Sequence, residues 1–251
     1  MKISFTGKQY ISLASVLFML LVWKILSLHF KSDFVLPSPE KTLITTLSLF
    51  TDGKFLATAG TTVSRGLIGF VISGILGIGA GILTGVNQYV NAFLRPILVT
   101  IRSIPVVSII LLALIWLHPG AVPVFIGMLT MFPFICTNVS DGIRSIDSEL
   151  VVMATFYKVS RKRIVGELYI PAVMPFIVSG ASSAMGIGWR AIIIGEVLSQ
   201  PRYGIGTMMQ NAQTFLNVDA VIAWTIIAVL ISYLFEKSIR LAEKKFITWR
   251  A

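Results

Sequence analysis

The stretch that decides the fold is GLIGFVISGILGIGAGILTGV, residues Gly66–Val86, which carries no charged residue. About 20 apolar residues in a helix cross a hydrocarbon core about 30 Å thick, so this segment predicts a membrane-spanning helix. Gly77, Gly81 and Gly85 recur at every fourth position and leave one face of the helix without side chains. In a membrane, such a face lets a second helix approach closely.

The composition of the whole chain agrees with a membrane protein. Of 251 residues, 55% are hydrophobic and only 13% are charged, and the mean hydropathy is +0.86. A soluble domain carries roughly 25% charged residues, so lipid must be part of the solvent of this chain. The net charge of +10 could indicate nucleic-acid binding. However, the basic residues lie beside apolar segments, where they orient a membrane protein instead.

Further apolar segments predict an all-α, polytopic membrane protein with about six transmembrane helices. The first segment follows a basic start like that of a signal peptide, but no small-residue cleavage site follows it, and we expect an uncleaved helix. The fifth segment again has small residues on one face, at Gly180, Ala184 and Gly188. The predicted spans besides Gly66–Val86 are residues 10–28, a longer segment at 92–117 interrupted by Pro96 and Pro105, and residues 122–139, 171–198 and 220–234.

The loops predict the orientation. Between the first two spans we expect a short amphipathic helix outside the membrane, with Ser38 as its N-cap and Pro39 at its first position. Residues 199–217 are expected to form a polar loop. Lysine and arginine concentrate at the N-terminus, in residues 141–170 and in the C-terminal tail. With about six spans these three regions share one side, which the positive-inside rule makes cytoplasmic, so both termini are predicted to be cytoplasmic.

Residues 141–170 are the most charged block of the chain. Their apolar residues Leu150, Val151, Ala154 and Tyr157 recur at three- and four-residue spacing, which predicts short amphipathic helices. One interpretation is a solvated loop, and the other is an exposed helix that docks into a groove on a soluble partner. The chain contains no G-x-x-x-x-G-K-[ST] loop, so any ATP-driven motor must be another chain.

Several motifs resemble those of binding-protein-dependent ABC importer permeases, in particular the nitrate/sulfonate/taurine branch. The resemblance extends from about Pro37 to the tail. The residues that carry it are Asp147-Ser148-Glu149-Leu150 through Ser160-Arg161, Ile170-Pro171-Ala172-Val173-Met174-Pro175, Leu36-Pro37-Ser38-Pro39, Leu94-Arg95-Pro96, Arg102-Ser103-Ile104-Pro105, Phe132-Pro133, Gly142-Ile143-Arg144-Ser145-Ile146-Asp147, and Trp189 to Glu196.

The resemblance implies a type I ABC importer permease fold with a cytoplasmic coupling helix. Residues 1–251 would form a single transmembrane permease domain, with a core at 60–240 and a coupling loop at about 141–170. Such a chain moves a small solute, nitrate-, sulfonate- or taurine-like, inward by alternating access. It is not an enzyme and holds no cofactor, since ATP and Mg²⁺ bind a partner ATPase. The residues expected to couple to that ATPase are Asp147, Ser148, Glu149, Leu150, Ala154, Tyr157, Lys158, Ser160 and Arg161.

The resemblance also implies the partners and the location. They are ATP-binding subunits, a second permease in a homodimer or a heterodimer, an extracytoplasmic substrate-binding protein and the lipid of a bacterial inner membrane, with no nucleic acid. The chain departs from the usual Glu-Ala-Ala motif at two positions, since Val152 replaces the glutamate and Lys158 the loop glycine. The departures put the docking geometry in question. They suit either an unusual ATPase or a heterodimer whose second permease carries the regular motif.

Charged residues inside spans are costly and mark a pathway or a partner. Arg102, Arg190 and Glu196 are therefore candidates for the translocation pathway, with a structural ion pair or a carbonyl clamp as the alternative for Arg190. Arginines there would suit an anion. In this class of importer, selectivity rests largely with the binding protein, so the cargo does not follow from this chain.

Two other classes of membrane protein predict sequence features that differ from those of an importer permease. A stand-alone secondary transporter or channel predicts broken helices in matching halves, and the chain shows no internal repeat. A membrane enzyme needs a nucleophile with a base, or a metal set, within the spans. With two separated histidines, His29 and His118, and the single Cys136 inside an apolar run, the sequence offers no such set.

Overall fold

The computed structural model describes residues 5–246, and side chains from residue 10 to residue 241. All elements within these residues are helices, which confirms the predicted all-α class. In chain order they are α1 (Phe5–Phe30), α2 (Pro39–Leu49), α3 (Phe55–Val86), α4 (Gln88–Ser103), α5 (Val106–Trp116), α6 (Val122–Arg144), α7 (Ser148–Phe156), α8 (Arg161–Ile164), a π-helix (Val165–Tyr169), α9 (Ile170–Ser199), α10 (Ile205–Thr214) and α11 (Val218–Phe246).

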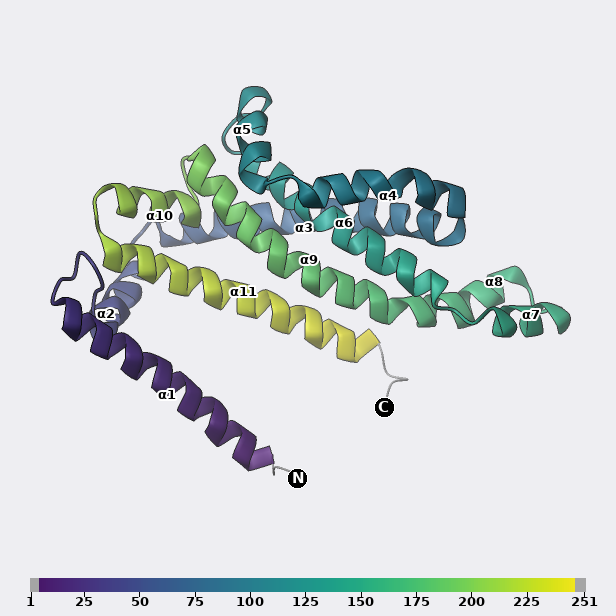
Figure 1. Cartoon of the computed structure of the whole chain (residues 1–251), viewed down its shortest axis with the longest axis horizontal. Helices are drawn as coiled ribbons and strands as arrows, with labels where there is room; N and C mark the ends of the chain where they lie inside the picture. Colours follow the sequence, from purple (N-terminus) through teal and green to yellow (C-terminus); the bar gives the residue numbers. More distant parts are fainter. Residues whose placement is uncertain (1–4, 247–251) are drawn as a thin grey trace.

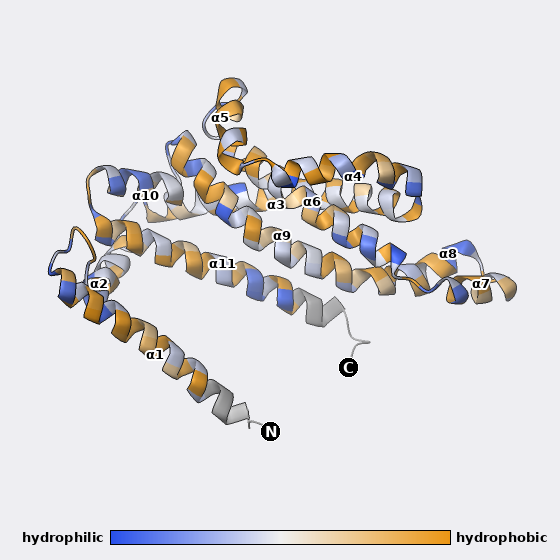
Figure 2. Ribbon diagram, in the orientation of Figure 1, coloured by the Kyte–Doolittle hydropathy of each residue, from blue (hydrophilic) through white to orange (hydrophobic). Residues whose placement is uncertain are grey.

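Five helices of the described part are long and apolar enough to cross a membrane, and the bent pair of α4 and α5 makes a sixth if it forms one crossing. This agrees with the prediction of about six spans. In Figure 1 the long helices α3, α6, α9 and α11 run side by side, with α7 and α8 at one end of the bundle and α2 and α10 at the other. We call these the α7 end and the α10 end. Figure 2 shows hydrophobic residues along the long helices and hydrophilic residues gathered on α8 and α10.

Three helices, α3, α6 and α9, form the core. A methyl group on Gly77 would lie 2.8 Å from the Cβ of Ile135, and one on Gly81 would lie 2.6 Å from the Cβ of Val139. The bare face of α3, which continues to Gly85, therefore lies directly against α6, as the glycine spacing predicts. Such contact brings the two backbones close enough for dispersion forces to hold the helices together in lipid.

The other face of α6 packs on α9 through a second row of small residues. A methyl group on Gly180 would lie 2.7 Å from the Cβ of Asn138. Ala184 is fully buried, and the next small residue, Gly188, contacts Met131 on α6. The predicted small face of the fifth span is thus the contact surface with the fourth.

Two helices replace the single interrupted segment expected at 92–117. α4 ends at Ser103, and α5 begins after Pro105 at an angle of 96° to it. Ile104 is extended, as the residue before a proline prefers to be. Pro96 lies within α4 without ending it.

The predicted start of α2 is confirmed, because the Ser38 hydroxyl accepts a hydrogen bond from the backbone N–H of Lys41 and Pro39 is the first helical residue. The prediction of a polar loop at 199–217 is wrong in its middle part, where α10 forms. No side chain caps α10, and its stability comes from packing, since Ile205 is fully buried. Sequence rules for helix starts therefore miss it.

Helix α1 stands apart from the core and leans away from it towards its N-terminal end (Figure 1). Its contacts are at the α10 end, where the indole N–H of Trp23 donates to the Pro37 carbonyl at 3.0 Å and Lys24 pairs with Glu40 at 2.8 Å. Most of its apolar side chains are exposed, so its surface is available to lipid or to another membrane helix.

Candidate functional site

Local backbone chemistry defines both ends of α7, the helix predicted to couple to a partner. Asp147 is its N-cap, and the carboxylate accepts a hydrogen bond from the backbone N–H of Glu149 at 2.8 Å. At the other end, the N–H of Val159 donates to the carbonyl of Ala154 at 3.0 Å, and the N–H of Lys158 donates to the carbonyl of Thr155 at 2.9 Å. This pair of bonds is a Schellman motif.

The Schellman motif explains why a glycine is usual at position 158. Lys158 has a φ of 57°, in the left-handed region where a side chain is strained and glycine is not. The replacement of glycine by lysine therefore keeps the turn but strains it. Lys158 therefore completes the Schellman motif at a cost in conformational energy.

The apolar residues of α7 divide between two faces, which differs from the single apolar face predicted from residues 150, 151, 154 and 157. Val151 and Ala154 are half-buried and face the rest of the chain. On the outer face Val152 is 67% exposed and Phe156 80% exposed, and with Met153 and Tyr157 they border a shallow hollow of about 460 Å³. Every residue of α7 is at least partly exposed.

The remaining predicted coupling residues lie around this helix. Ser148 and Glu149 are exposed in the first turn and border the same hollow as Phe156. Leu150 is exposed, and Ser160 is the N-cap of α8. Arg161 begins α8 and lies on a different groove, described below. The structure thus brings most of the predicted set together at the α7 end.

Arg102, the first predicted pathway residue, lies at the end of α4 against α6. Its guanidinium donates to the Pro133 carbonyl at 2.9 Å and to the Thr137 hydroxyl, and it lies 4.9 Å from the centre of the Phe134 ring. These contacts orient the cation while the residue stays exposed. A small hollow of about 170 Å³ adjoins it, lined also by Ile187.

Arg190, the second predicted pathway residue, is exposed on α9. It lines a hollow of about 370 Å³ between α9 and α11, together with the hydroxyls of Ser182, Ser183 and Ser232 and the carboxylate of Glu236. Glu236 pairs with Arg240 on its own helix. Ile187 lines this hollow and also the hollow beside Arg102, so the two arginines flank one open face of α9.

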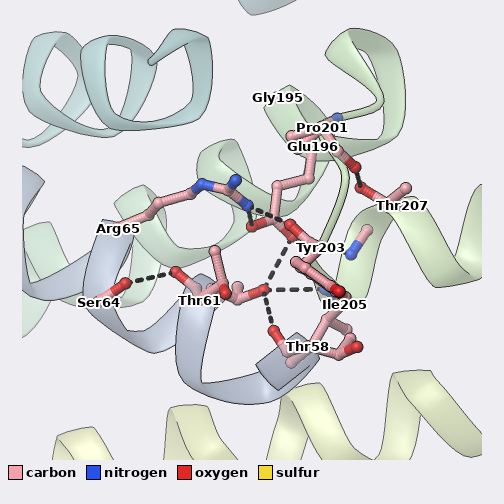
Figure 3. Close-up of polar contacts among 12 residues, drawn as sticks. Thr58, Thr61, Ser64, Arg65, Gly195, Glu196, Pro201, Tyr203, Ile205 and Thr207 are labelled. Carbon is pink, nitrogen blue, oxygen red and sulfur yellow. Dashed lines mark hydrogen bonds and ion pairs between the residues drawn. The ribbon is translucent and has the colours of Figure 1, made fainter. Parts of the chain in front are cut away.

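Glu196, the third predicted pathway residue, is fully buried at the α10 end. Figure 3 shows Arg65 reaching from α3 towards its carboxylate, and the two form an ion pair at 2.6 Å. The carboxylate also accepts hydrogen bonds from the Thr62 hydroxyl at 3.0 Å and from the backbone N–H of Gly206 at 3.0 Å. Arg65 donates in addition to the Tyr203 carbonyl at 2.7 Å. The ion pair and these hydrogen bonds compensate for the cost of removing the two charges from water.

The chain between α9 and α10 is shaped around this carboxylate. A methyl group on Gly204 would lie 2.6 Å from the carboxyl carbon of Glu196, so only glycine lets the backbone pass there. The Thr62 hydroxyl also accepts a hydrogen bond from the backbone N–H of Ile205 at 2.8 Å, at the start of α10. We call Thr62, Arg65, Glu196 and Gly206 the buried polar cluster. It joins α3, α9 and α10.

Neither Arg65 nor Thr62 is among the site residues predicted from the sequence. Arg65 is one of three charged residues between Lys54 and Asp141. Arg65 directly precedes the predicted span Gly66–Val86, and the structure places it inside α3, where a charge calls for a partner. Glu196 is the acidic residue of the fifth predicted span. Their opposite charges could have suggested that Arg65 and Glu196 form an ion pair, although nothing in the sequence shows that the two residues are in contact.

Comparisons with known proteins agree on one kind of protein. The family model described as "Binding-protein-dependent transport system inner membrane component" matches residues 73–248. A protein named as an aliphatic sulfonates transport permease, from Escherichia coli K12, is 30% identical over 91% of this chain and 87% of its own length. The taurine transport system permease protein of the same organism is 24% identical over 90% of this chain and 84% of its own length. The bicarbonate transport system permease protein of Synechococcus elongatus is 29% identical over 80% of this chain and 76% of its own length.

Proposed function

Since this chain belongs to the family of binding-protein-dependent transport system inner membrane components, we propose that it moves a small anion inward by alternating access. It is the multi-pass, non-catalytic permease subunit of an ABC importer in the inner membrane. A separate ATPase supplies the energy. A substrate-binding protein delivers the solute, and a second permease, identical or related, completes the pathway.

The outer face of α7 is the proposed docking surface for the ATPase, and it is the observation that carries the proposal. The outer face of this short helix exposes apolar side chains, and its ends are held by the Asp147 side chain and by backbone hydrogen bonds; these residues are Val152, Met153, Phe156 and Tyr157. Exposed aromatic residues of this kind anchor helices in grooves of partner proteins. Because Val152 stands where a glutamate is usual, the ATPase should offer an apolar contact at that point.

The proposed cargo is an anion because the open face of α9 is flanked by two exposed cations. Arg102 is held in place by a carbonyl and a hydroxyl, and Arg190 lines a hollow together with three serines and with Glu236, whose carboxylate is paired with Arg240. Guanidinium groups and hydroxyls are donors suited to carboxylate, sulfonate or carbonate oxygens. The names of the relatives point the same way, since aliphatic sulfonates and bicarbonate are anions and taurine carries a sulfonate.

Glu196 has a different role in this proposal. Its carboxylate is enclosed and paired with Arg65, which leaves it unable to contact a passing solute. We assign the buried polar cluster to holding α3, α9 and α10 as one rigid body. Alternating access requires such bodies, because movement at α7 reaches the opposite end only through elements that do not deform.

The proposed orientation places the α7 end in the cytoplasm. In the described part α8 carries three successive basic residues, and Arg240 lies near the end of α11. Figure 1 shows α11 running from the α10 end towards the side of α7 and α8. Lysine and arginine next to spans favour the cytoplasmic side.

The test is recovery of the intact complex. The chain is purified from its native membrane in mild detergent, and co-purifying proteins are identified and assayed for ATP hydrolysis. An ATPase should be recovered in stoichiometric amount, and a second permease, if recovered, would define a heterodimer. A chain recovered alone, without ATP hydrolysis, would favour a stand-alone transporter.

Two matched variants locate the docking surface. Phe156→Asp places a charge on the outer face of α7, and Phe215→Asp does the same for an equally exposed phenylalanine, 82% exposed, after α10. Phe156→Asp should lower recovery of the ATPase at least tenfold, since a central aromatic anchor contributes about 2 kcal/mol or more. Phe215→Asp should leave recovery unchanged. Equal recovery for both variants would contradict docking through α7.

A further inference from the structure

A groove of about 560 Å³ at the α7 end is separate from the docking face of α7 and from the open face of α9. The last turns of α3 and α6, the π-helix and the first turns of α9 form its walls, and the inner face of α7 borders it. Ile82, Ile143, Ile170 and Val173 are typical of its lining, which is almost entirely aliphatic. The groove therefore lies near one end of three candidate spans, Phe55–Val86, Val122–Arg144 and Arg161–Ser199.

Among the described residues that line this groove, Arg161 is the single charged one. The neighbouring Arg163 pairs with Glu167 at 2.8 Å. No described carboxylate pairs with Arg161, which is exposed at the start of α8. The groove thus combines a long aliphatic surface with one cation at its rim that has no counter-ion among the described residues.

We propose that the groove binds one acyl chain of an anionic phospholipid, with the lipid phosphate paired to Arg161. The chain would cover aliphatic surface that water solvates poorly, and the phosphate would neutralise the guanidinium. Because α3 and α9 are long and apolar enough to cross a membrane, a lipid acyl chain fits their walls better than a soluble protein does. Basic residues next to spans favour anionic headgroups. This inference does not depend on the proposed cargo or on docking of an ATPase.

The experiment uses the full chain with any subunits that accompany it in mild detergent. The sample is exposed to equal amounts of phosphatidylglycerol and phosphatidylethanolamine with identical acyl chains, and retained lipid is counted by native mass spectrometry. The wild-type protein should retain more phosphatidylglycerol than phosphatidylethanolamine. Arg161→Ala should lower that retention about fivefold, the factor expected for one basic contact to an anionic lipid.

Two further variants separate the groove from general charge. Val165→Trp fills the groove while keeping Arg161, and it should lower phosphatidylglycerol retention as well. Lys237→Ala removes an exposed cation of α11 outside the groove, and it should leave the retention of phosphatidylglycerol unchanged. The proposal is overturned if wild type retains both lipids equally, or if phosphatidylglycerol retention is the same in wild type, Arg161→Ala and Val165→Trp.

Discussion

The two ends of the helical bundle are built in opposite ways. At the α10 end, Arg65 and Glu196 are buried and form an ion pair, and the Glu196 carboxylate also accepts hydrogen bonds from Thr62 and Gly206. At the α7 end, every residue of α7 is at least partly exposed, and its outer face presents Val152 and Phe156. One end is closed by tertiary contacts, and at the other end α7 is held by local hydrogen bonds, namely the Asp147 cap and the backbone bonds of its last turn.

This difference separates a part that transmits movement from a part that receives it. A buried ion pair with all partners satisfied tolerates little change, because moving either ion leaves the other uncompensated. A short helix capped by its own neighbours can shift as a unit against a partner without breaking a core.

The largest effect should come from Glu196→Ala at the α10 end. Loss of the carboxylate leaves the Arg65 cation buried without a partner, and the free energy of unfolding should fall by about 3–5 kcal/mol. Unfolding by sodium dodecyl sulfate in mild detergent measures it. The free energy of unfolding should fall less in the double variant Arg65→Met with Glu196→Leu, because no charge is then buried. A loss for the single variant no larger than for the double one would contradict the role given to the pair.

Strained turns at both ends offer the next comparison. Lys158 after α7 and Leu216 after α10 have φ values of 57° and 55°, and both stand where a Schellman motif favours glycine. Lys158→Gly and Leu216→Gly should each relieve about 1 kcal/mol of strain.

The two glycine variants should differ in whether the relief of strain stabilises the whole fold or only the local helix. Leu216→Gly should raise the global free energy of unfolding, since α10 is part of the closed end. Lys158→Gly should slow amide hydrogen exchange within residues 148–159 and leave global unfolding unchanged. A global gain from Lys158→Gly would show that α7 unfolds together with the core.

The helix caps provide a smaller test. Asp147→Ala removes the N-cap of α7, and Ser38→Ala removes that of α2. Each cap contributes about 1 kcal/mol. Hydrogen exchange in α7 should rise by roughly fivefold in Asp147→Ala. Exchange in α2 should rise less in Ser38→Ala, because Thr42 and Thr46 of α2 are buried in the fold. Equal increases would argue against a locally held α7.

The smallest effect should come from pH at the contact between α1 and α2. The hydrogen bond from Lys24 lowers the pKa of the Glu40 carboxyl below its ordinary value. The contact is therefore fully present above the ordinary pKa of a glutamate and is lost as the pH falls through the lowered value. The distance between spin labels on α1 and α2 should increase over that acidic range. Glu40→Gln should show no pH dependence there, and a change near neutral pH would point to another group.

Much of the fold was predictable because membrane helices are set by local sequence. Apolar length predicted the spans, the Ser38-Pro39 pair predicted the start of α2, and the glycine and alanine rows predicted which faces of α3 and α9 pack closely. The motifs around residues 141–170 predicted the family that the comparisons show. The roles of the coupling and pathway residues stay predictions that the experiments above address.

The sequence by itself determined which segments are apolar enough to cross the membrane, where α2 begins and which faces of α3 and α9 are small, because these features depend on residues that are close together in the chain. Only the tertiary structure decided the pairing of Arg65 with Glu196, which are 131 residues apart, the formation of α10, the 96° bend between α4 and α5, and the outward face of α7. Each of these features depends on which helix surfaces contact each other in the bundle. Local sequence patterns do not show which distant segments will be in contact.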